Sequence, residues 1–541
     1  MDYKEQKIFT YLKQRKLFER LDVFPFIILH SLCIVLYVSM DITIILKFLL
    51  FGILFLAQFV VFFSKFWSES LRATISFKVL KELSFATHVR IDIVNNKFKM
   101  NNRTGISQII HSNKDELISI EFEKIKYLFN KEKSLFEKSK FNFKIELGKF
   151  LNAEPYTSEQ EIEKLKVKYG NNLMKVPIPS FFSLYKEHIV APFFVFQLFC
   201  ILLWVFDDYG LHSGMTLLML CIFEATVVAQ RIINLVTLRK MRVPPQYIFV
   251  YRNHEWRKIS SSELIPGDIV SILDGSSTEI CNEQIDEEEE SSNLILKFLK
   301  KMKELKHRAE AQRRQQSVSQ VINRNRERES SPLTCDMLIL SGSAIVNEAM
   351  LTGESVPQIK ESINKVEHEF NNIFDYKSKH KNNVLFSGTK IVKISSSEEE
   401  SDLLPKKVKI YPPDNGCVCL VLKTGFGTSQ GKLLRTVLYS SERSKGDSSE
   451  AWIFIFILLF FALWAAYYVL KEGIEREGEL TYKLFLRTII IITSVVPAEL
   501  PIELTLAINN SLFFLQSKAI VCIEPFRIPF AGKVCVYFNI D

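Results

Sequence analysis

Six apolar runs, the first of them short, constrain the fold of this 541-residue chain more than any other feature of its sequence. Runs of this length are typical of helices that cross a bilayer, because a backbone in lipid must form its hydrogen bonds within the segment itself. We therefore expect an α-helical transmembrane bundle of six spans, arranged as a leading hairpin followed by two pairs. The six runs cover residues 24–39, 45–67, 190–206, 213–236, 451–470 and 485–515.

The distribution of charge predicts which side of the membrane each soluble segment occupies. Six Lys or Arg residues fall between Lys4 and Arg20, and Arg239, Lys240 and Arg242 follow the fourth run. Basic residues are enriched in cytosolic segments, so we expect the N-terminus and all large soluble blocks in the cytosol. The turn at 207–212 has no Lys or Arg, and glutamates at 472, 475, 477 and 479 occupy the expected loop between the last two runs. Both of these connections are expected on the opposite side.

The soluble blocks divide the chain into segments with different patterns. Alternation at His88–Ile93 and Phe141–Ile145 predicts strands in a small mixed domain, and five strand-like runs after residue 243 predict a β-rich domain. Those five runs lie at 246–251, 268–273, 337–340, 389–394 and 417–422. The expected segments are 1–69 (N-terminus and hairpin), 70–182 (small domain), 183–238 (core spans 1 and 2), 239–450 (β-rich domain), 451–518 (core spans 3 and 4) and 519–541 (start of a further domain).

A charged insertion at 276–332 interrupts the β-rich domain. It opens with Asp286 and four glutamates and continues as a stretch rich in Lys, Arg, Glu and Gln. Blocks of like charge are usually solvated or disordered, which is the interpretation we favour; a docking or regulatory arm is the alternative.

The remaining composition excludes several classes of protein. The net charge of +8 fits positive charge beside membrane spans, and no run interleaves aromatic residues with arginines as a nucleic-acid surface would. The nine cysteines contain no Cys-x-x-Cys pair, so we expect reduced thiols without a disulfide framework or a metal site. A paired ligand role for Cys417 and Cys419 is the alternative. No cleavable signal peptide is evident.

The motif Thr352-Gly353-Glu354-Ser355 holds one carboxylate between two hydroxyls on a glycine turn, just after a Val/Ile/Leu-rich run. This arrangement suits an acid that reaches out of its own domain and positions a water molecule in another. Thr352 and Ser355 either act directly or only shape the turn. Four residues alone are weak evidence, so the interpretation depends on the rest of the chain.

The last apolar run contains a predicted break. Pro497 and Pro501 each remove a backbone donor, so the carbonyls of Thr493 and Pro497 lose their helical partners. Broken helices at mid-depth form substrate sites in transporters, and the acids Glu499 and Glu503 lie one turn apart beside this break. A structural kink with snorkelling or protonated acids is the alternative. Glu224, in the fourth run, is a further intramembrane acid that is either functional, or located near the membrane interface or paired with a neighbour.

Taken together, several segments resemble the P-type ATPases, and closely the A subgroup of the type V members. Glu499 favours the A subgroup, because the B subgroup, linked to polyamine export, has alanine there. Ala498 departs from the pattern, in which a second proline is expected. The other segments that carry the resemblance are Leu264–Val270, Cys335–Leu340 with Gly342, Asn347–Pro357, Phe386–Thr389, Thr424–Lys432 and Glu524–Lys533.

The resemblance implies that the β-rich block is an actuator domain, and that ATP and magnesium drive a cycle through an aspartyl phosphate. Glu354 then positions the water that cleaves the phosphoenzyme, with Thr352, Gly353 and Ser355 in the same catalytic loop. In the A subgroup the implied substrate is a misinserted transmembrane helix, removed from the endoplasmic reticulum membrane. We expect membrane lipid as a further partner, no nucleic acid and a monomer. The expected substrate contacts are Pro497, Ala498, Glu499, Leu500, Pro501 and Glu503.

The end of the chain departs from the family. The resemblance places Asp-Lys-Thr-Gly-Thr shortly after Phe530-Ala531-Gly532-Lys533, but Val534–Asp541 follow here, and an ungapped count puts the aspartate on Ile540. We therefore expect the N-terminal half of a pump, without its ATP and magnesium sites and inactive alone, as a truncated gene model or mis-spliced product would give. A cation or polyamine pump, or a non-enzymatic interacting fragment, are the alternatives.

Overall fold

The structure is a computed structural model whose described residues form two compact units, each discontinuous in sequence. The first unit comprises residues 1–109, 179–234 and 439–541, and the second comprises 110–178 and 235–438. The described residues are 6–39, 44–94, 103–111, 118–139, 141, 145–206, 210–240, 242–273, 332–363, 372–376, 378–395, 411–439, 449–477 and 482–494, with isolated positions from 507 to 528.

Several expectations lie outside these residues. The charged insertion is described only at Pro332, and the strand expected at Phe141–Ile145 only at its two end residues. The broken helix, with Pro497, Ala498, Glu499, Leu500, Pro501 and Glu503, lies entirely outside. Most of 519–541 does so as well.

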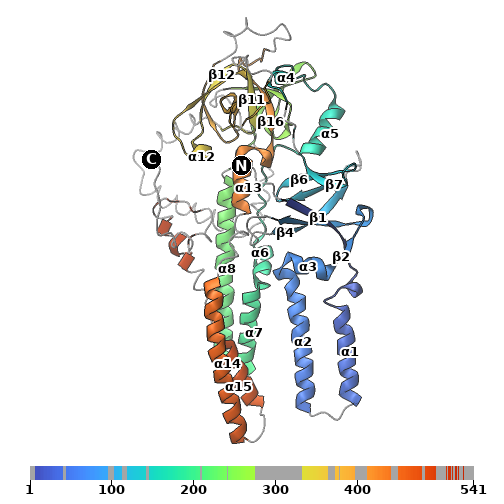
Figure 1. The fold of residues 1–541 in the computed structure, drawn as a ribbon. Helices are drawn as coiled ribbons and strands as arrows, with labels where there is room; N and C mark the ends of the chain where they lie inside the picture. The colour runs from blue at the N-terminus through green and yellow to red at the C-terminus, as the bar shows by residue number, and fades with distance from the viewer. Residues whose placement is uncertain are drawn as a thin grey trace. The chain divides into compact units, whose positions relative to one another are not determined.

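Long apolar helices of the first unit begin where hydropathy predicts (Figure 1). α1 (Phe24–Ser39) and α2 (Ile44–Trp67) form the leading hairpin, and α7 (Pro192–Phe206) matches the third apolar run. The fourth run lies within α8 (Gly210–Lys240), and α15 (Tyr482–Ser494) covers the described start of the sixth.

One boundary prediction is wrong. α14 (Ser449–Glu477) continues past the apolar run, so Glu472, Glu475 and Glu477 belong to a helix rather than to a loop. Glutamate is a good helix former, and Lys471 lies 3.9 Å from Glu475 one turn later.

Among the described residues, one helix is long and apolar enough to cross a bilayer, namely Gly210–Ile233 within α8. A second candidate is the pair formed by α6 (Phe181–Ile189) and Phe194–Phe206, which is bent by 65°. Shorter apolar helices cover Phe24–Val35 and Leu54–Trp67. The six-span bundle therefore stays a prediction.

A buried carboxylate holds the base of the leading hairpin. Asp22, which is 1% exposed, accepts from Arg20 at 2.6 Å and from Lys65 at 3.1 Å, so it joins the start of α1 to the end of α2. Burial alone would raise the pKa of the Asp22 carboxyl, but the hydrogen bonds and charges of Arg20 and Lys65 outweigh it and hold the pKa below its usual range.

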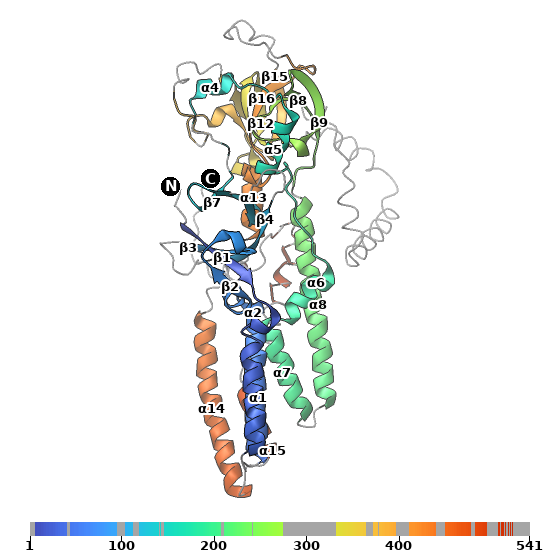
Figure 2. The ribbon, with the colours of Figure 1, turned by 90° about the vertical axis from the view of Figure 1, so that its right-hand side faces the viewer.

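An antiparallel sheet in the order β2-β1-β3-β4 completes the described first unit (Figure 2). β3 (His88–Val94) confirms the predicted strand, and it lies between β1 (Gln6–Gln14) and β4 (Arg103–His111). Sequence reasoning missed β1, because its lysines made the segment resemble a solvated cytosolic tail. Leu12 nevertheless is buried against Phe77, the first residue of β2 (Phe77–Leu80).

The second unit begins with a small antiparallel meander and a helix. β5 (Ile118–Phe122) pairs with β6 (Ile125–Asn130), and β6 pairs with β7 (Leu135–Lys138). The short α4 (Leu147–Leu151) and then α5 (Glu159–Tyr169) follow.

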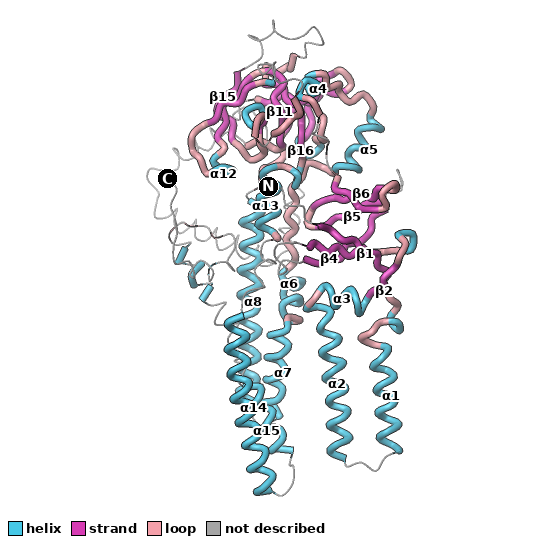
Figure 3. The backbone as a smooth tube through the Cα atoms, in the orientation of Figure 1, coloured by secondary structure: helices cyan, strands magenta, loops and turns pink. Residues whose placement is uncertain are grey.

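All five strands predicted for the β-rich block are present. Figure 3 shows strands, in magenta, running through this part of the chain. A six-stranded sheet has the order β14-β11-β16-β10-β8-β9, and a second sheet has the order β13-β12-β15. The first sheet consists of β8 (Tyr247–Arg252), β9 (Glu255–Ser260), β10 (Ile269–Ile272), β11 (Asp336–Ser341), β14 (Val384–Leu385) and β16 (Cys417–Lys423). The second consists of β12 (Ser343–Asn347), β13 (Gln358–Glu361) and β15 (Lys390–Ser395).

The near-continuous apolar sequence of β16 follows from burial of both its faces. Cys417, Cys419 and Val421 enter one apolar core, which also contains Val346 and Ile391 of the smaller sheet. The alternate residues Val418, Leu420 and Leu422 enter a second core, which the α4 residues Leu147 and Phe150 cover. Because successive side chains of a strand point to opposite faces, a strand between two cores needs apolar residues throughout.

Candidate functional site

The hairpin of β12 and β13 carries the Thr352–Ser355 motif at its turn. The strands pair from Ser343 opposite Glu361 to Val346 opposite Gln358. The Asn347 side chain accepts a hydrogen bond from the backbone of Ala349 at 2.9 Å, which starts the one-turn helix α12 (Ala349–Thr352). The turn thus has a defined backbone from its first residue.

Gly353 ends α12 with a φ of +82°, in the left-handed region that favours glycine. No heavy atom lies within 4 Å of the place that a Cβ would take. The requirement for glycine here is therefore conformational and does not come from lack of space.

The Thr352 hydroxyl shapes this turn. It donates to the Glu348 carbonyl at 3.2 Å and accepts from the backbone N–H of Glu354 at 3.2 Å. Residues 352–357 are all exposed, so the carboxylate of Glu354 is presented to solvent beside Ser355. The catalytic assignment of these four positions stays a prediction, but their geometry suits a carboxylate that acts on another domain.

A buried ion pair closes the base of the turn. Nζ of Lys360, in β13, lies 2.7 Å from Oε1 of Glu348, and these side chains are 1% and 3% exposed. Nζ also donates to the carbonyl of Lys381 at 3.1 Å and lies 5.2 Å from the centre of the Phe386 ring. Burial lowers the pKa of the Lys360 ammonium, and the neighbouring Glu348 carboxylate opposes that shift.

Sequence reasoning did not single out this pair. The available signal is an inversion in β13, where Lys360 is buried while its neighbour Ile359 is 63% exposed. A lysine in a short strand is ordinarily assigned to the solvent face. The burial of Lys360 is therefore recognised only once its partner Glu348 is known.

Asp336, at the start of β11, joins two further motif segments. Its carboxylate accepts from the backbone N–H of Ser387 at 3.0 Å, and from the backbone N–H and hydroxyl of Ser429 at 3.1 Å each. Lys423 lies 3.9 Å away. Burial raises the pKa of Asp336, while Lys423 and the two serines oppose the shift. The segments Phe386–Thr389 and Thr424–Lys432 thus meet at one buried carboxylate.

The Pro266-Gly267-Asp268 turn is held from both sides. Asp268 forms a two-point ion pair with Arg252, at 2.9 and 2.6 Å, and accepts from the backbone of Ile265 at 2.9 Å. Gly267 has a φ of +99°, and a Cβ there would overlap the Tyr156 hydroxyl. That hydroxyl donates to the Pro266 carbonyl at 2.9 Å, and burial raises the pKa of Tyr156 to about 12. This turn is structural rather than exposed for reaction.

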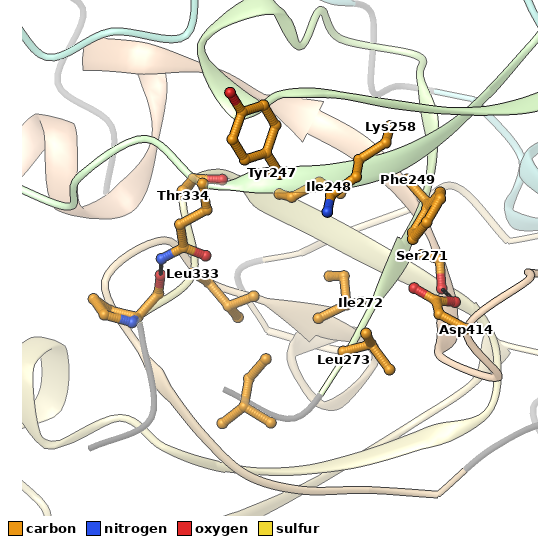
Figure 4. A pocket seen from close by; sticks show the side chains of 13 residues that line it. Tyr247, Ile248, Phe249, Lys258, Ser271, Ile272, Leu273, Leu333, Thr334 and Asp414 are labelled. Carbon is orange, nitrogen blue, oxygen red and sulfur yellow. Dashed lines mark hydrogen bonds between the residues drawn. The ribbon is translucent and has the colours of Figure 1, made fainter. Parts of the chain in front are cut away.

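A pocket of about 80 Å³ opens beside β8 and β10 (Figure 4). Ile248, Ile272 and Leu333 give it a largely aliphatic wall. At its edge the Ser271 hydroxyl donates to Asp414 at 2.5 Å. Its volume suits a few water molecules, so it is too small for a polypeptide segment.

Glu224, on α8, has a partner in the first unit. Its Oε2 lies 3.1 Å from Nδ1 of His188 on α6, and Arg231 lies 3.4 Å from the other ring nitrogen of His188. The side chains of Glu224 and His188 are each 22% exposed. The structure therefore favours the paired interpretation of this acid.

The two cysteines of β16 are fully buried, with sulfur atoms 3.9 Å apart, and Cys417 donates to the Ser341 carbonyl at 3.1 Å. Burial raises the pKa of Cys419 well above its ordinary value. Within the described part of the chain, no group of three or more His, Cys, Asp or Glu side chains is arranged to hold a metal ion.

Comparisons with known proteins agree with the resemblance that the motifs carry. Residues 328–437 match the P-type ATPase actuator domain. The chain is 41% identical over 393 residues to the endoplasmic reticulum transmembrane helix translocase spfA of Aspergillus fumigatus, covering 72% of this chain and 26% of the relative.

Two further relatives extend the match. The endoplasmic reticulum transmembrane helix translocase of Saccharomyces cerevisiae is 36% identical over 474 residues, or 87% of this chain and 34% of the relative. The probable manganese-transporting ATPase PDR2 of Arabidopsis thaliana is 35% identical over 530 residues, or 96% of this chain and 40% of the relative. The chain thus spans between about a quarter and two fifths of the length of these relatives.

Proposed function

Since the chain carries a P-type ATPase actuator domain and resembles the N-terminal part of the type V, A-subgroup members, we propose that it serves an ATP-driven helix translocase. The substrate would be a misinserted transmembrane helix, and the site of action the endoplasmic reticulum membrane. The relatives from Aspergillus fumigatus and Saccharomyces cerevisiae are endoplasmic reticulum transmembrane helix translocases, which supports this assignment.

The observation that carries the proposal is the placement of Glu354. Its carboxylate is exposed on a turn whose base is fixed by the buried Glu348–Lys360 pair. A carboxylate held this way can orient a water molecule and accept its proton when an aspartyl phosphate of another domain is brought to it. Thr352 and Gly353 set the backbone, and Ser355 accompanies the carboxylate.

ATP with magnesium supplies the phosphoryl group and neutralises charge on it. The described residues offer no cluster for a metal ion, so no step of the proposal assigns such a site to this chain. The role of this chain in the proposal is to bring Glu354 to the aspartyl phosphate, and to couple the movement of its β-rich domain to the membrane helices.

For the membrane part we propose six spans, formed by α1, α2, α7, α8, α14 and a last helix that begins with α15. The break predicted at Pro497 and Pro501 would open a polar cleft beside Glu499. Such a cleft suits a polypeptide better than a bare ion, because freed backbone carbonyls and an acid can meet the polar groups of a misplaced helix.

Cation transport is the second candidate, and it is favoured by the Arabidopsis thaliana relative, a probable manganese-transporting ATPase. Glu499 would then be a cation ligand. A non-enzymatic role as an interacting fragment is the third.

A chimera separates these candidates. The chain would replace the corresponding N-terminal part of the Saccharomyces cerevisiae relative, with Glu499→Gln as the variant and Glu255→Gln, on the exposed β9 strand, as the control. We expect the chimera to clear misinserted membrane proteins and Glu499→Gln to impair clearance. Loss of cation-stimulated turnover without any effect on clearance would favour cation transport instead. A chimera with neither clearance nor cation-stimulated turnover would favour the third candidate, a non-enzymatic interacting fragment.

A further inference from the structure

We propose that the Glu348–Lys360 ion pair is a positioning element that fixes the direction in which the turn presents Glu354. This inference rests on the dephosphorylation role proposed above for Glu354. It adds two residues that act through the geometry of the turn without touching the reacting groups.

Glu348 controls the turn through both its backbone and its side chain. Its carbonyl accepts from the backbone N–H groups of Leu351 and Thr352, at 2.8 and 3.0 Å, and from the Thr352 hydroxyl at 3.2 Å. The same residue is tied to Lys360 through its carboxylate. A shift of Glu348 would therefore move α12, and with it Gly353 and Glu354.

Lys360 is held on the opposite side of the turn by a rigid frame. Its backbone pairs with Ala344 of β12, and its ammonium reaches the Lys381 carbonyl. The buried Asn383 side chain then donates to the carbonyls of Glu361 and Ser362, at 3.0 and 3.4 Å. These contacts fix both strand and ammonium, so Lys360 is a stationary anchor for Glu348.

The outer part of the turn has little packing to orient it. Residues 352–357 are exposed, and the apolar side chains of Met350 and Val356 are 53% and 66% exposed. Apart from the hydrogen bond between the Glu354 N–H and the Thr352 hydroxyl, the described restraint on the direction of Glu354 therefore comes from the base of the turn.

Burying an ion pair removes two charges from water, and the free energy that this costs can cancel their attraction. The pair therefore need not contribute to stability, which can be tested separately from positioning. Two buried charges can often be replaced by well-packed apolar residues of similar volume without loss of stability, whereas removal of one partner leaves an uncompensated charge. An apolar pair lacks the attraction between ammonium and carboxylate that ties Glu348 to Lys360. Stability and positioning can therefore be separated by substitution.

The test uses the chimera described above and measures phosphoenzyme formation from ATP, phosphoenzyme decay and thermal stability. The variants are Lys360→Met, the double variant Glu348→Leu/Lys360→Met, and Lys393→Met as a matched control on the exposed face of β15. Misplacement of a catalytic group by about 1 Å can slow a reaction up to about a hundredfold. We expect both variants at position 360 to slow decay at least about tenfold, with phosphoenzyme formation and the Lys393→Met control unchanged.

The double variant carries the test if Lys360→Met fails to fold. We expect it to regain wild-type thermal stability while its phosphoenzyme still decays slowly. Recovery of stability and decay together would overturn the inference, because the pair would then serve stability alone, and slowing of formation and decay to the same extent would also overturn it. Glu354→Gln serves as the reference: normal decay in that variant would refute the proposed role of Glu354 itself, whereas slow decay there with normal decay in the double variant would refute only the positioning role.

Discussion

Replacing Asp336 with alanine tests whether a buried carboxylate, in addition to the apolar cores, holds the actuator domain together. The substitution removes the acceptor of two backbone N–H groups, on Ser387 and Ser429, and of the Ser429 hydroxyl. A buried donor without an acceptor costs about 1–3 kcal/mol, so the two N–H groups alone predict a loss of about 4 kcal/mol. In a domain of this size each kcal/mol lowers Tm by about 2–4 °C, which gives a decrease of about 10 °C. Asp336→Asn keeps one acceptor oxygen and should lose about half as much.

The assay is thermal unfolding of the full chain in detergent, with hydrogen exchange of peptides covering the segments that meet at Asp336. Glu255→Ala is the control, because the Glu255 side chain is 72% exposed in the same domain. We expect faster exchange at Phe386–Thr389 and Thr424–Lys432 in Asp336→Ala. A Tm within about 2 °C of the control would refute the reasoning.

Three further predictions follow from single positions. Gly267→Ala should destabilise the domain by more than about 2 kcal/mol, since its Cβ overlaps Tyr156 and its φ is +99°, and denaturant unfolding measures this. Gly353→Ala has room for its Cβ, so we expect a loss below about 2 kcal/mol but slower phosphoenzyme decay in the chimera. The Asp22 carboxyl has a pKa below its unfolded value near 3.8, so its contribution to stability is present above about pH 4 and is lost as the pH falls through the folded pKa. Asp22→Asn should remove this contribution, so that stability falls less between pH 5 and pH 3 in the variant than in the wild type. The same fall in stability in both proteins would contradict the prediction.

The strands of the β-rich domain could be predicted because their buried faces require runs of apolar residues, which are visible in the sequence. β16 between two cores requires apolar residues throughout, and the predicted run 417–422 matches Cys417–Lys423. β1 escaped prediction because Lys7 and Lys13 conceal the inward-facing Leu12. Propensity for helix likewise extends α14 beyond its apolar run, so hydropathy alone gave too early an end.

The candidate site was predictable in its exposed part and hidden in its buried part. In the Thr352–Ser355 motif, Gly353 predicts a turn, and Glu354 predicts an exposed carboxylate on it. The support beneath it depends on the register of β12 and β13, which brings Lys360 back to Glu348 and which local sequence does not specify. Pairings between distant segments, such as Asp336 with Ser429, are hidden for the same reason.

The most direct test of the account is the rate of phosphoenzyme decay in the chimera carrying Glu354→Gln. Glutamine keeps the size of the side chain and its exposed position but cannot accept a proton from water. We predict that the variant forms its phosphoenzyme normally and then retains it, with decay slowed at least about a hundredfold, while Glu255→Gln behaves as wild type. Unchanged decay in the Glu354→Gln variant would contradict the central claim.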